Sequence, residues 1–87
     1  MPVVCRFHGI TIYIYFDDHN PPHFHAVYAG KKAVFRIDTL ERIEGSVPKA
    51  QEGLIVKWAY FRRKELYDAW QTIAINKQQH TGIKPIK

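Results

Sequence analysis

Residues 17–25, which read DDHNPPHFH, bring together two aspartates and three histidines, side chains that can transfer protons or bind metal ions. His23 and His25 are two positions apart, so they share one face if this segment is a β-strand, whereas Phe24 and Ala26 share the other face. If Phe24 packs into a core, both imidazoles point to the open side of a sheet. The spacing therefore predicts a pair of histidines on an accessible surface.

One interpretation of this motif is an acid–base centre that acts on a phosphodiester, because imidazole exchanges protons near neutral pH and a carboxylate can orient it. The candidate catalytic residues are Asp18, His19, His23 and His25. Neighbouring strands would supply the groups that bind a nucleic acid, since arginine neutralises phosphate and aromatic rings stack on bases. The candidates for this role are Arg6, Tyr13, Tyr15 and Arg36.

A second interpretation of the same motif is a metal site, because two histidines at positions i and i+2 can bind one ion. Its ligands would be Asp17, His19, His23 and His25. The single cysteine, Cys5, lies outside the motif, so a closed structural zinc site is not expected. An open site for a transition metal such as zinc is the form that this interpretation takes, and no other cofactor is predicted.

A third, purely structural interpretation is a tight turn followed by a strand. Pro21 and Pro22 restrict φ and exclude Asn20 from the α region, and Asp18 and Asn20 can form hydrogen bonds with the local backbone. On this interpretation the prolines shape the loop, and the face that carries the histidine pair merely tolerates polar groups.

Length and charge limit the class of protein. The 87 residues fit a single domain, residues 1–87, with a modest core that a partner protein or a homodimer would help to stabilise. Thirteen Lys and Arg against eight Asp and Glu give a net charge of +5, which favours an acidic partner such as RNA or an acidic protein. One cysteine suits a reducing compartment, and no apolar run is long enough for a membrane span or a signal peptide. We therefore expect a cytoplasmic protein without membrane association.

Hydrophobic periodicity predicts the elements that must position the motif. Strands are expected over about residues 2–44, helices over about 47–77 and a loose polar tail over 78–87. These elements predict an α+β fold, with an antiparallel sheet of four to five strands followed by two C-terminal helices. The helical segment could be one long helix or two helices packed as a hairpin; we favour two, packed on one face of the sheet, which makes a two-layer sandwich.

Alternation along the strands assigns each side chain to one of the two sheet faces. The expected buried face consists of Val3, Cys5, Phe7, Ile10, Ile12, Ile14, Phe16, Ala33, Phe35 and Ile37. The expected open face carries Arg6, His8, Tyr13, Tyr15, Arg36 and Asp38. The open face would therefore combine basic, aromatic and imidazole groups.

The segment RFHGITIYIYFDDHNPPHFHAVYAGKKAVFRIDTLERIEGSVP resembles the small prokaryotic family catalogued as domain of unknown function 4160. The resemblance runs from Pro2 to about Trp70, and the string DHNPPHFH is its most specific part. Such domains are often encoded beside another small protein in the manner of toxin–antitoxin pairs, so the resemblance implies a cognate small partner protein. The polar residues of the family pattern without an evident structural role are Arg6, Asp18, His19, His23 and His25.

Three functions follow from these observations. The first is a toxin–antitoxin-type module whose basic face is directed at RNA, with a histidine-dependent ribonuclease as its catalytic form. The second is a non-catalytic partner of an adjacent small protein. The third is a histidine-rich metal-binding domain. The sequence leaves open whether the protein is an enzyme.

Overall fold

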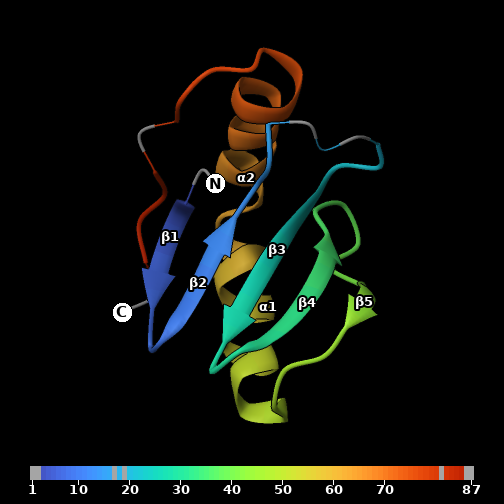
Figure 1. The fold of residues 1–87 in the computed structure, drawn as a ribbon, viewed down its shortest axis with the longest axis vertical. Helices are drawn as coiled ribbons and strands as arrows, with labels where there is room; N and C mark the ends of the chain where they lie inside the picture. The colour runs from blue at the N-terminus through green and yellow to red at the C-terminus, as the bar shows by residue number, and fades with distance from the viewer. Residues whose placement is uncertain (1–2, 17, 19, 81, 86–87) are drawn as a thin grey trace.

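The computed structural model describes residues 3–16, 18, 20–80 and 82–85. Its front layer is an antiparallel sheet in which five strands follow one another in chain order, as Figure 1 shows. The strands are β1 (Val3–Phe7), β2 (Ile10–Tyr13), β3 (His23–Tyr28), β4 (Lys31–Arg36) and β5 (Arg42–Gly45). Each strand pairs with the next one in sequence; β1–β2 and β3–β4 are joined by two-residue turns, whereas a longer loop over residues 14–22 joins β2 to β3.

The second layer consists of helices that cover one face of the sheet. They are α1 (Lys49–Phe61), α2 (Arg63–Trp70) and a short π-helix, η1 (Gln71–Ile75). Figure 1 shows α1 and α2 behind the strands, which leaves the opposite face of the sheet without a helix. The predicted α+β fold with two C-terminal helices is confirmed. Within the described ranges, no helix has the length and apolar character that crossing a membrane requires.

The two helices do not fold back on each other, so the expected hairpin is wrong. Arg62 interrupts the helix with φ of −115° and ψ of 17°. Its N–H still donates to the carbonyl oxygens of Trp58 and Ala59, and its own carbonyl accepts the N–H of Leu66. Helical hydrogen bonding therefore continues across the break, and α2 extends beyond α1 along the sheet (Figure 1).

The core lies between the sheet and the helices, and it fixes the register of the central strands. Phe24 of β3 pairs with Phe35 of β4, and their rings stack with centroids 5.5 Å apart. Trp58 of α1 contacts Phe24 edge-on at 6.0 Å. Because Phe24 is fully buried, His23 and His25 on either side of it are directed to the other face. The buried positions predicted correctly are Cys5, Phe7, Ile10, Ile12, Ile14, Ala33, Phe35 and Ile37.

Two residues expected in the core are not buried. Val3 is 37% exposed and Phe16 is 36% exposed. An irregularity in the pairing of β1 between Val3 and Cys5 shifts the alternation, so Val4 occupies the core position and is only 2% exposed. Phe16 lies beyond the end of β2, which stops at Tyr13 instead of continuing to Phe16 as expected. Both errors have the same cause, because alternation holds only while the strand is regular.

The C-terminal tail is also not loose, in contrast to the expectation for residues 78–87. Ile83 is 7% exposed, and its N–H donates to the carbonyl oxygen of Val4 at 2.7 Å. The indole Nε1–H of Trp58 donates to the carbonyl oxygen of Lys84 at 2.9 Å. In Figure 1 this red segment runs along the outer side of β1. The described part of the tail is therefore packed against both layers of the domain.

Gly45 allows β5 to approach β4 closely. Its φ is +65°, which side-chain-bearing residues rarely adopt, and a Cβ at this position would overlap the carbonyl oxygen of Lys32. The same carbonyl accepts the N–H of Ser46 at 2.9 Å. Glycine is therefore required where β5 ends, next to the open face.

Candidate functional site

Asp18, His23 and His25 meet where β3 begins, and we call them the Asp18–His23–His25 centre. One carboxylate oxygen of Asp18, Oδ1, lies 3.4 Å from His23 Nε2 and 3.3 Å from His25 Nε2. The other, Oδ2, is also 3.3 Å from His25 Nε2. The three side chains are 10%, 14% and 21% exposed, respectively. One carboxylate thus contacts two partly buried imidazoles at distances longer than the roughly 2.7–2.9 Å of strong charge-assisted hydrogen bonds.

The backbone of the turn holds the members of this centre in place. The N–H of Tyr15 donates to Asp18 Oδ2 at 2.9 Å, and the N–H of Asp18 donates back to the carbonyl oxygen of Tyr15 at 3.2 Å. On the other side of the turn, Nδ1 of His23 lies 2.6 Å from the carbonyl oxygen of Pro21. These local hydrogen bonds fix the carboxylate and one imidazole before any contact with distant residues is counted.

Aromatic rings surround both histidines. The ring of Tyr13 is nearly parallel to that of His25, with an angle of 8° and 5.9 Å between centroids, and Tyr15 contacts the same imidazole edge-on at 4.5 Å. His23 lies 5.2 Å from the ring of Trp70, at the end of α2. Tyr13 was expected on an accessible face, but it is only 6% exposed because its neighbours cover it. Aromatic side chains are therefore closely packed around both histidines.

This packing changes the proton affinity of two side chains. Burial lowers the pKa of His25 below its ordinary value, and the Asp18 carboxylate, which favours the charged imidazolium, offsets this only in part. Burial also raises the pKa of Tyr13, and the neighbouring Tyr15 phenol adds to that effect. His25 therefore favours its neutral form at neutral pH.

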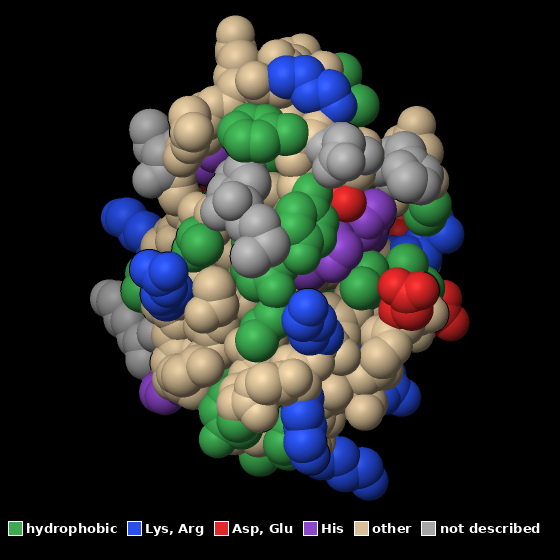
Figure 2. Space-filling view, in the orientation of Figure 1, with side chains coloured by type: hydrophobic (Ala, Val, Ile, Leu, Met, Phe, Trp, Pro, Cys, Tyr) green, Lys and Arg blue, Asp and Glu red, His purple; other side chains and the backbone are tan. Residues whose placement is uncertain are grey.

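A groove opens directly beside His25 on the same face. The register aligns Tyr13, His25, Val34 and Glu44 in one row across β2 to β5. Val34 has the smallest side chain of that row, so it forms the floor of a hollow of about 270 Å³. The groove is lined by His25, Lys32, Val34, Glu44 and Gly45. Figure 2 shows the histidines of this face between hydrophobic, acidic and basic side chains. An elongated ligand in the groove would therefore touch one member of the centre.

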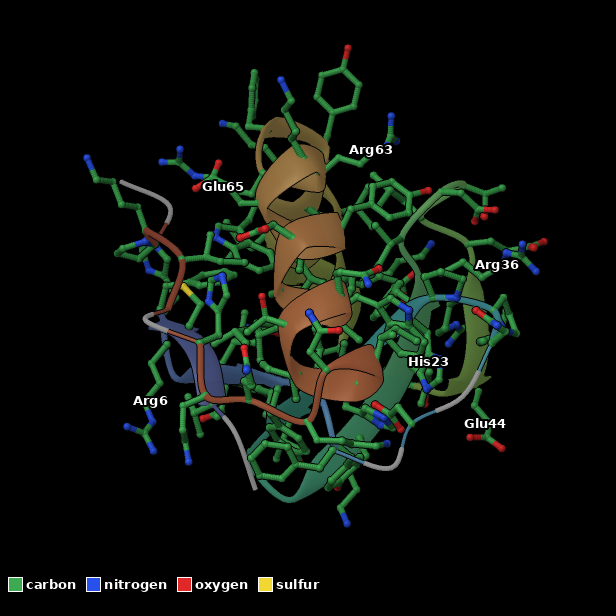
Figure 3. The ribbon with its side chains drawn as sticks, turned by 90° about the horizontal axis from the view of Figure 1, so that it is seen from above. Arg6, His23, Arg36, Glu44, Arg63 and Glu65 are labelled. Carbon is green, nitrogen blue, oxygen red and sulfur yellow. The ribbon has the colours of Figure 1, made fainter. Side chains whose placement is uncertain are left out.

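Of the two arginines predicted to bind phosphate, Arg6 lies away from the centre, whereas Arg36 pairs with His23 across β3 and β4. Arg36 forms a bidentate pair with Asp38, with Nε and Nη2 donating at 2.9 and 2.8 Å. This pair lowers the pKa of Asp38 to about 2 and raises that of Arg36. Figure 3 shows Arg6 on the opposite side of the molecule from both His23 and Arg36. Of the four residues predicted to bind nucleic acid, the two tyrosines contact His25 through their rings and Arg36 neighbours His23 across the strands.

The remaining site residues divide into those outside the described ranges and those that the sequence did not suggest. Asp17 and His19 lie outside the described residues, and Asp18 provides the carboxylate that contacts the histidines. Lys32 and Glu44 were not predicted as site residues, although both line the groove next to His25. The signal that could have found them is the pairing register of β3, β4 and β5, which alternation within one strand does not provide.

Comparison with known proteins identifies the family. The family model described as Domain of unknown function (DUF4160) matches residues 9–71, which is more than half of the chain. The chain therefore belongs to this family, as its resemblance predicted. No curated protein and no solved structure gave a significant match. The function must therefore be argued from the site itself.

Proposed function

We propose that this member of the DUF4160 family is a small RNA-directed protein of a toxin–antitoxin-type pair, and that RNA is cleaved at the Asp18–His23–His25 centre. The observation that carries the proposal is one carboxylate in contact with two imidazoles at the edge of an open groove. Groups of this type accept and donate protons at neutral pH when they are held in position. The proposal includes a cytoplasmic location, where RNA is the abundant acidic partner.

The centre suits the chemistry of a phosphodiester. In RNA cleavage the 2′-hydroxyl oxygen attacks phosphorus and loses its proton, while the 5′-oxygen leaves and gains one. The rings of His23 and His25 have centroids 5.1 Å apart, so both proton transfers can be served within one centre. His25 also lines the groove, and it is therefore the member of the centre that substrate would reach first.

The groove offers the contacts that a polyanion needs. Lys32 lines the same groove as His25, and its ammonium would neutralise a phosphate bound there. Across the groove, the Glu44 carboxylate could accept hydrogen bonds from the amino group of a base. Tyr15 contacts His25 from the opposite side, where a partly exposed ring can stack on a base. These contacts, together with the net charge of +5, support single-stranded RNA as the substrate.

The direct test is cleavage of single-stranded RNA by the purified protein. We expect the His25→Ala variant to cleave at least about 100-fold more slowly, since positioned proton-transfer groups contribute on that scale. The matched control is His80→Ala, because His80 also lies 3.3 Å from a carboxylate, that of Asp68, but does not line the groove. The control should cleave RNA at the rate of the unmodified protein.

The cellular test uses the same variants. Expression of the protein should slow growth and accelerate RNA decay, and co-expression of the small protein encoded beside it should relieve both effects. The His25→Ala variant should be harmless at equal abundance. The proposal is wrong if the purified protein leaves RNA intact, or if His25→Ala cleaves it as fast as the His80→Ala control does.

A second candidate function, a non-catalytic protein-interaction module, is favoured by one feature of α1. Tyr60 and Phe61 are 62% and 68% exposed, and the guanidinium of Arg63 lies 5.7 Å from the Tyr60 ring. Two adjacent exposed rings beside basic residues suit an acidic protein surface. Replacing both rings by serine should weaken binding of the adjacent gene's product without changing RNA cleavage. Unchanged affinity in that double variant would contradict this second candidate.

A further inference from the structure

The Asp18–His23–His25 centre has the composition of a metal site as well as that of a proton-transfer site. We propose that Asp18 Oδ1, His23 Nε2 and His25 Nε2 bind one divalent first-row transition-metal ion such as Zn²⁺. One donor atom from each of the three side chains lies within 4.8 Å of the others. Two imidazoles and one carboxylate are a ligand set that proteins use for catalytic zinc and for non-haem iron.

The distances between the donor atoms agree with an ion placed among them. A tetrahedral ion with ligand bonds of about 2.0–2.2 Å holds neighbouring donor atoms roughly 3.4 Å apart. Asp18 Oδ1 lies 3.3 Å from His25 Nε2 and 3.4 Å from His23 Nε2. Direct hydrogen bonds between a charged imidazole and a carboxylate are shorter, at about 2.7–2.9 Å. The spacing therefore matches that of two ligands on one ion and is longer than that of strong charge-assisted hydrogen bonds.

The environment of His23 determines which of its ring nitrogens can bind an ion. Nδ1 lies 2.6 Å from the carbonyl oxygen of Pro21, and a carbonyl oxygen can only accept, so Nδ1 carries a hydrogen. In the neutral ring Nε2 then has a lone pair, and that lone pair is directed at the Asp18 carboxylate. Two electron-rich groups in such proximity repel each other unless a positive charge lies between them, and that charge is either a proton on Nε2 or a metal ion. A backbone carbonyl that fixes the far nitrogen is also the usual support of a metal-binding histidine.

His80 provides an internal comparison, because its hydrogen bonds run in the opposite direction. The N–H of Gly82 donates to His80 Nδ1 at 3.0 Å, so in the neutral ring Nε2 carries the hydrogen. That Nε2–H donates to Asp68 Oδ2 at 3.3 Å, which is an ordinary hydrogen bond that needs no ion. The contact of His23 with Asp18 has a similar length but needs an added positive charge, a proton or a metal ion, and a second imidazole lies beside it.

The carboxylate and the opening of the site fit the same assignment. Asp18 Oδ2 accepts the N–H of Tyr15, which orients Oδ1 towards both imidazoles. Three protein ligands would leave one position of a tetrahedral ion for water or substrate, and His25, one of these ligands, also lines the groove. The site therefore has the form of a catalytic metal site and not that of a closed structural one.

An ion here would also supply what the predicted arginines do not. Arg6 lies away from the histidines, and Arg36, although it pairs with His23 across the strands, has its guanidinium bound to Asp38, so a phosphate at the centre would depend on Lys32 and the ion for neutralisation. The imidazoles would then act as ligands, and a water on the ion would carry the proton-transfer chemistry. The ion's role in cleavage rests on the proposed RNA-directed function, but the binding site itself does not.

The experiment is a metal titration of protein produced without a histidine tag and treated with EDTA. Zn²⁺ binding is measured by calorimetry, and Co²⁺ binding by the visible absorption of the protein-bound ion. We expect one ion per chain, with affinity lowered more than about 10-fold in Asp18→Asn and His23→Gln. The His80→Ala control should bind as tightly as the unmodified protein. Asp18→Asn changes the charge with almost no change in volume, so the fold should persist.

NMR keeps the proposal testable even if a variant fails to fold. In the unmodified protein, added Zn²⁺ should shift the ring-nitrogen signals of His23 and His25 and leave those of His80 in place. The absence of saturable binding, or equal affinity in a folded Asp18→Asn variant, would overturn the proposal. None of these measurements uses RNA, so a protein that binds the ion but leaves RNA intact would refute only the proposed function.

Discussion

Replacing Lys32 by alanine isolates the contribution of the groove to RNA binding, because the chain provides a matched control one residue away. Lys31 and Lys32 are consecutive in β4 and both are exposed. Side chains alternate along a strand, so Lys32 shares the open face with Val34, whereas Lys31 is on the side of the core residues. Lys31→Ala and Lys32→Ala each lower the net charge of +5 by one, and they differ only in the face from which the charge is removed.

The size of the expected loss in RNA affinity follows from the exposure of the groove to solvent. A phosphate about 4 Å from an ammonium in water gains roughly 1 kcal/mol, which corresponds to about a fivefold change in Kd. One lost phosphate contact should also reduce the slope of log K against log salt concentration by about 0.7 for a single strand. We therefore expect Lys32→Ala to weaken RNA binding about fivefold at low salt and to flatten its salt dependence, with much smaller changes for Lys31→Ala.

The assay is fluorescence anisotropy of a labelled single-stranded RNA over a series of salt concentrations. His25→Ala protein can serve as the background for both lysine variants, so that cleavage does not disturb the equilibrium. Equal losses in Lys31→Ala and Lys32→Ala would show that RNA responds to net charge alone. That result would refute the assignment of the groove as the phosphate-binding surface.

Two further predictions concern stability and titration. Gly45→Ala should lower the free energy of unfolding by about 2–4 kcal/mol in a urea titration, because a Cβ at φ of +65° is strained and overlaps the Lys32 carbonyl; an unchanged midpoint would contradict this. In an NMR titration, the carboxyl of Asp38 should show a pKa of about 2, and Arg36→Ala should raise it towards 3.8. Since the folded-state pKa is the lower one, the stabilisation from this pair is fully present above the ordinary carboxyl pKa and is lost as pH falls towards 2. An Asp38 pKa that does not respond to Arg36→Ala would show that the guanidinium is not its cause.

The layers of the fold could be predicted because periodicity reports which side of a regular element is buried. Phe24, Phe35 and Ile12 all occupy the buried face, as their alternation indicated. The errors occur where the chain departs from regularity. The bulge in β1 exposes Val3, and Ile83, which packs against β1, lies in a mostly polar segment whose few apolar residues form no periodic pattern.

The sequence could predict which site residues are close along the chain, but not which residues strand pairing brings to them. His23 and His25 share a face because they are two positions apart, and Asp18 lies in the turn directly before them. Lys32 and Glu44 join them through the pairing of three strands, which depends on turn geometry and on the contact between phenylalanines in the core. For the same reason, alternation along β1 correctly assigned Arg6 to the open face, but the distance between Arg6 and the histidines was not predictable.

The C-terminal tail makes the two edges of the sheet unequal. On the outer side of β1, the N–H of Ile83 donates to the carbonyl oxygen of Val4. Among the residues in the described ranges, no backbone hydrogen bond is made to the outer side of β5. An open edge is a template for strand pairing with another chain, and a sheet with two open edges can extend without limit. With one edge occupied by its own chain, this sheet can add a strand from a partner, or pair with one copy of itself about a twofold axis, and then stop. The tail thus favours finite assemblies over open-ended aggregation.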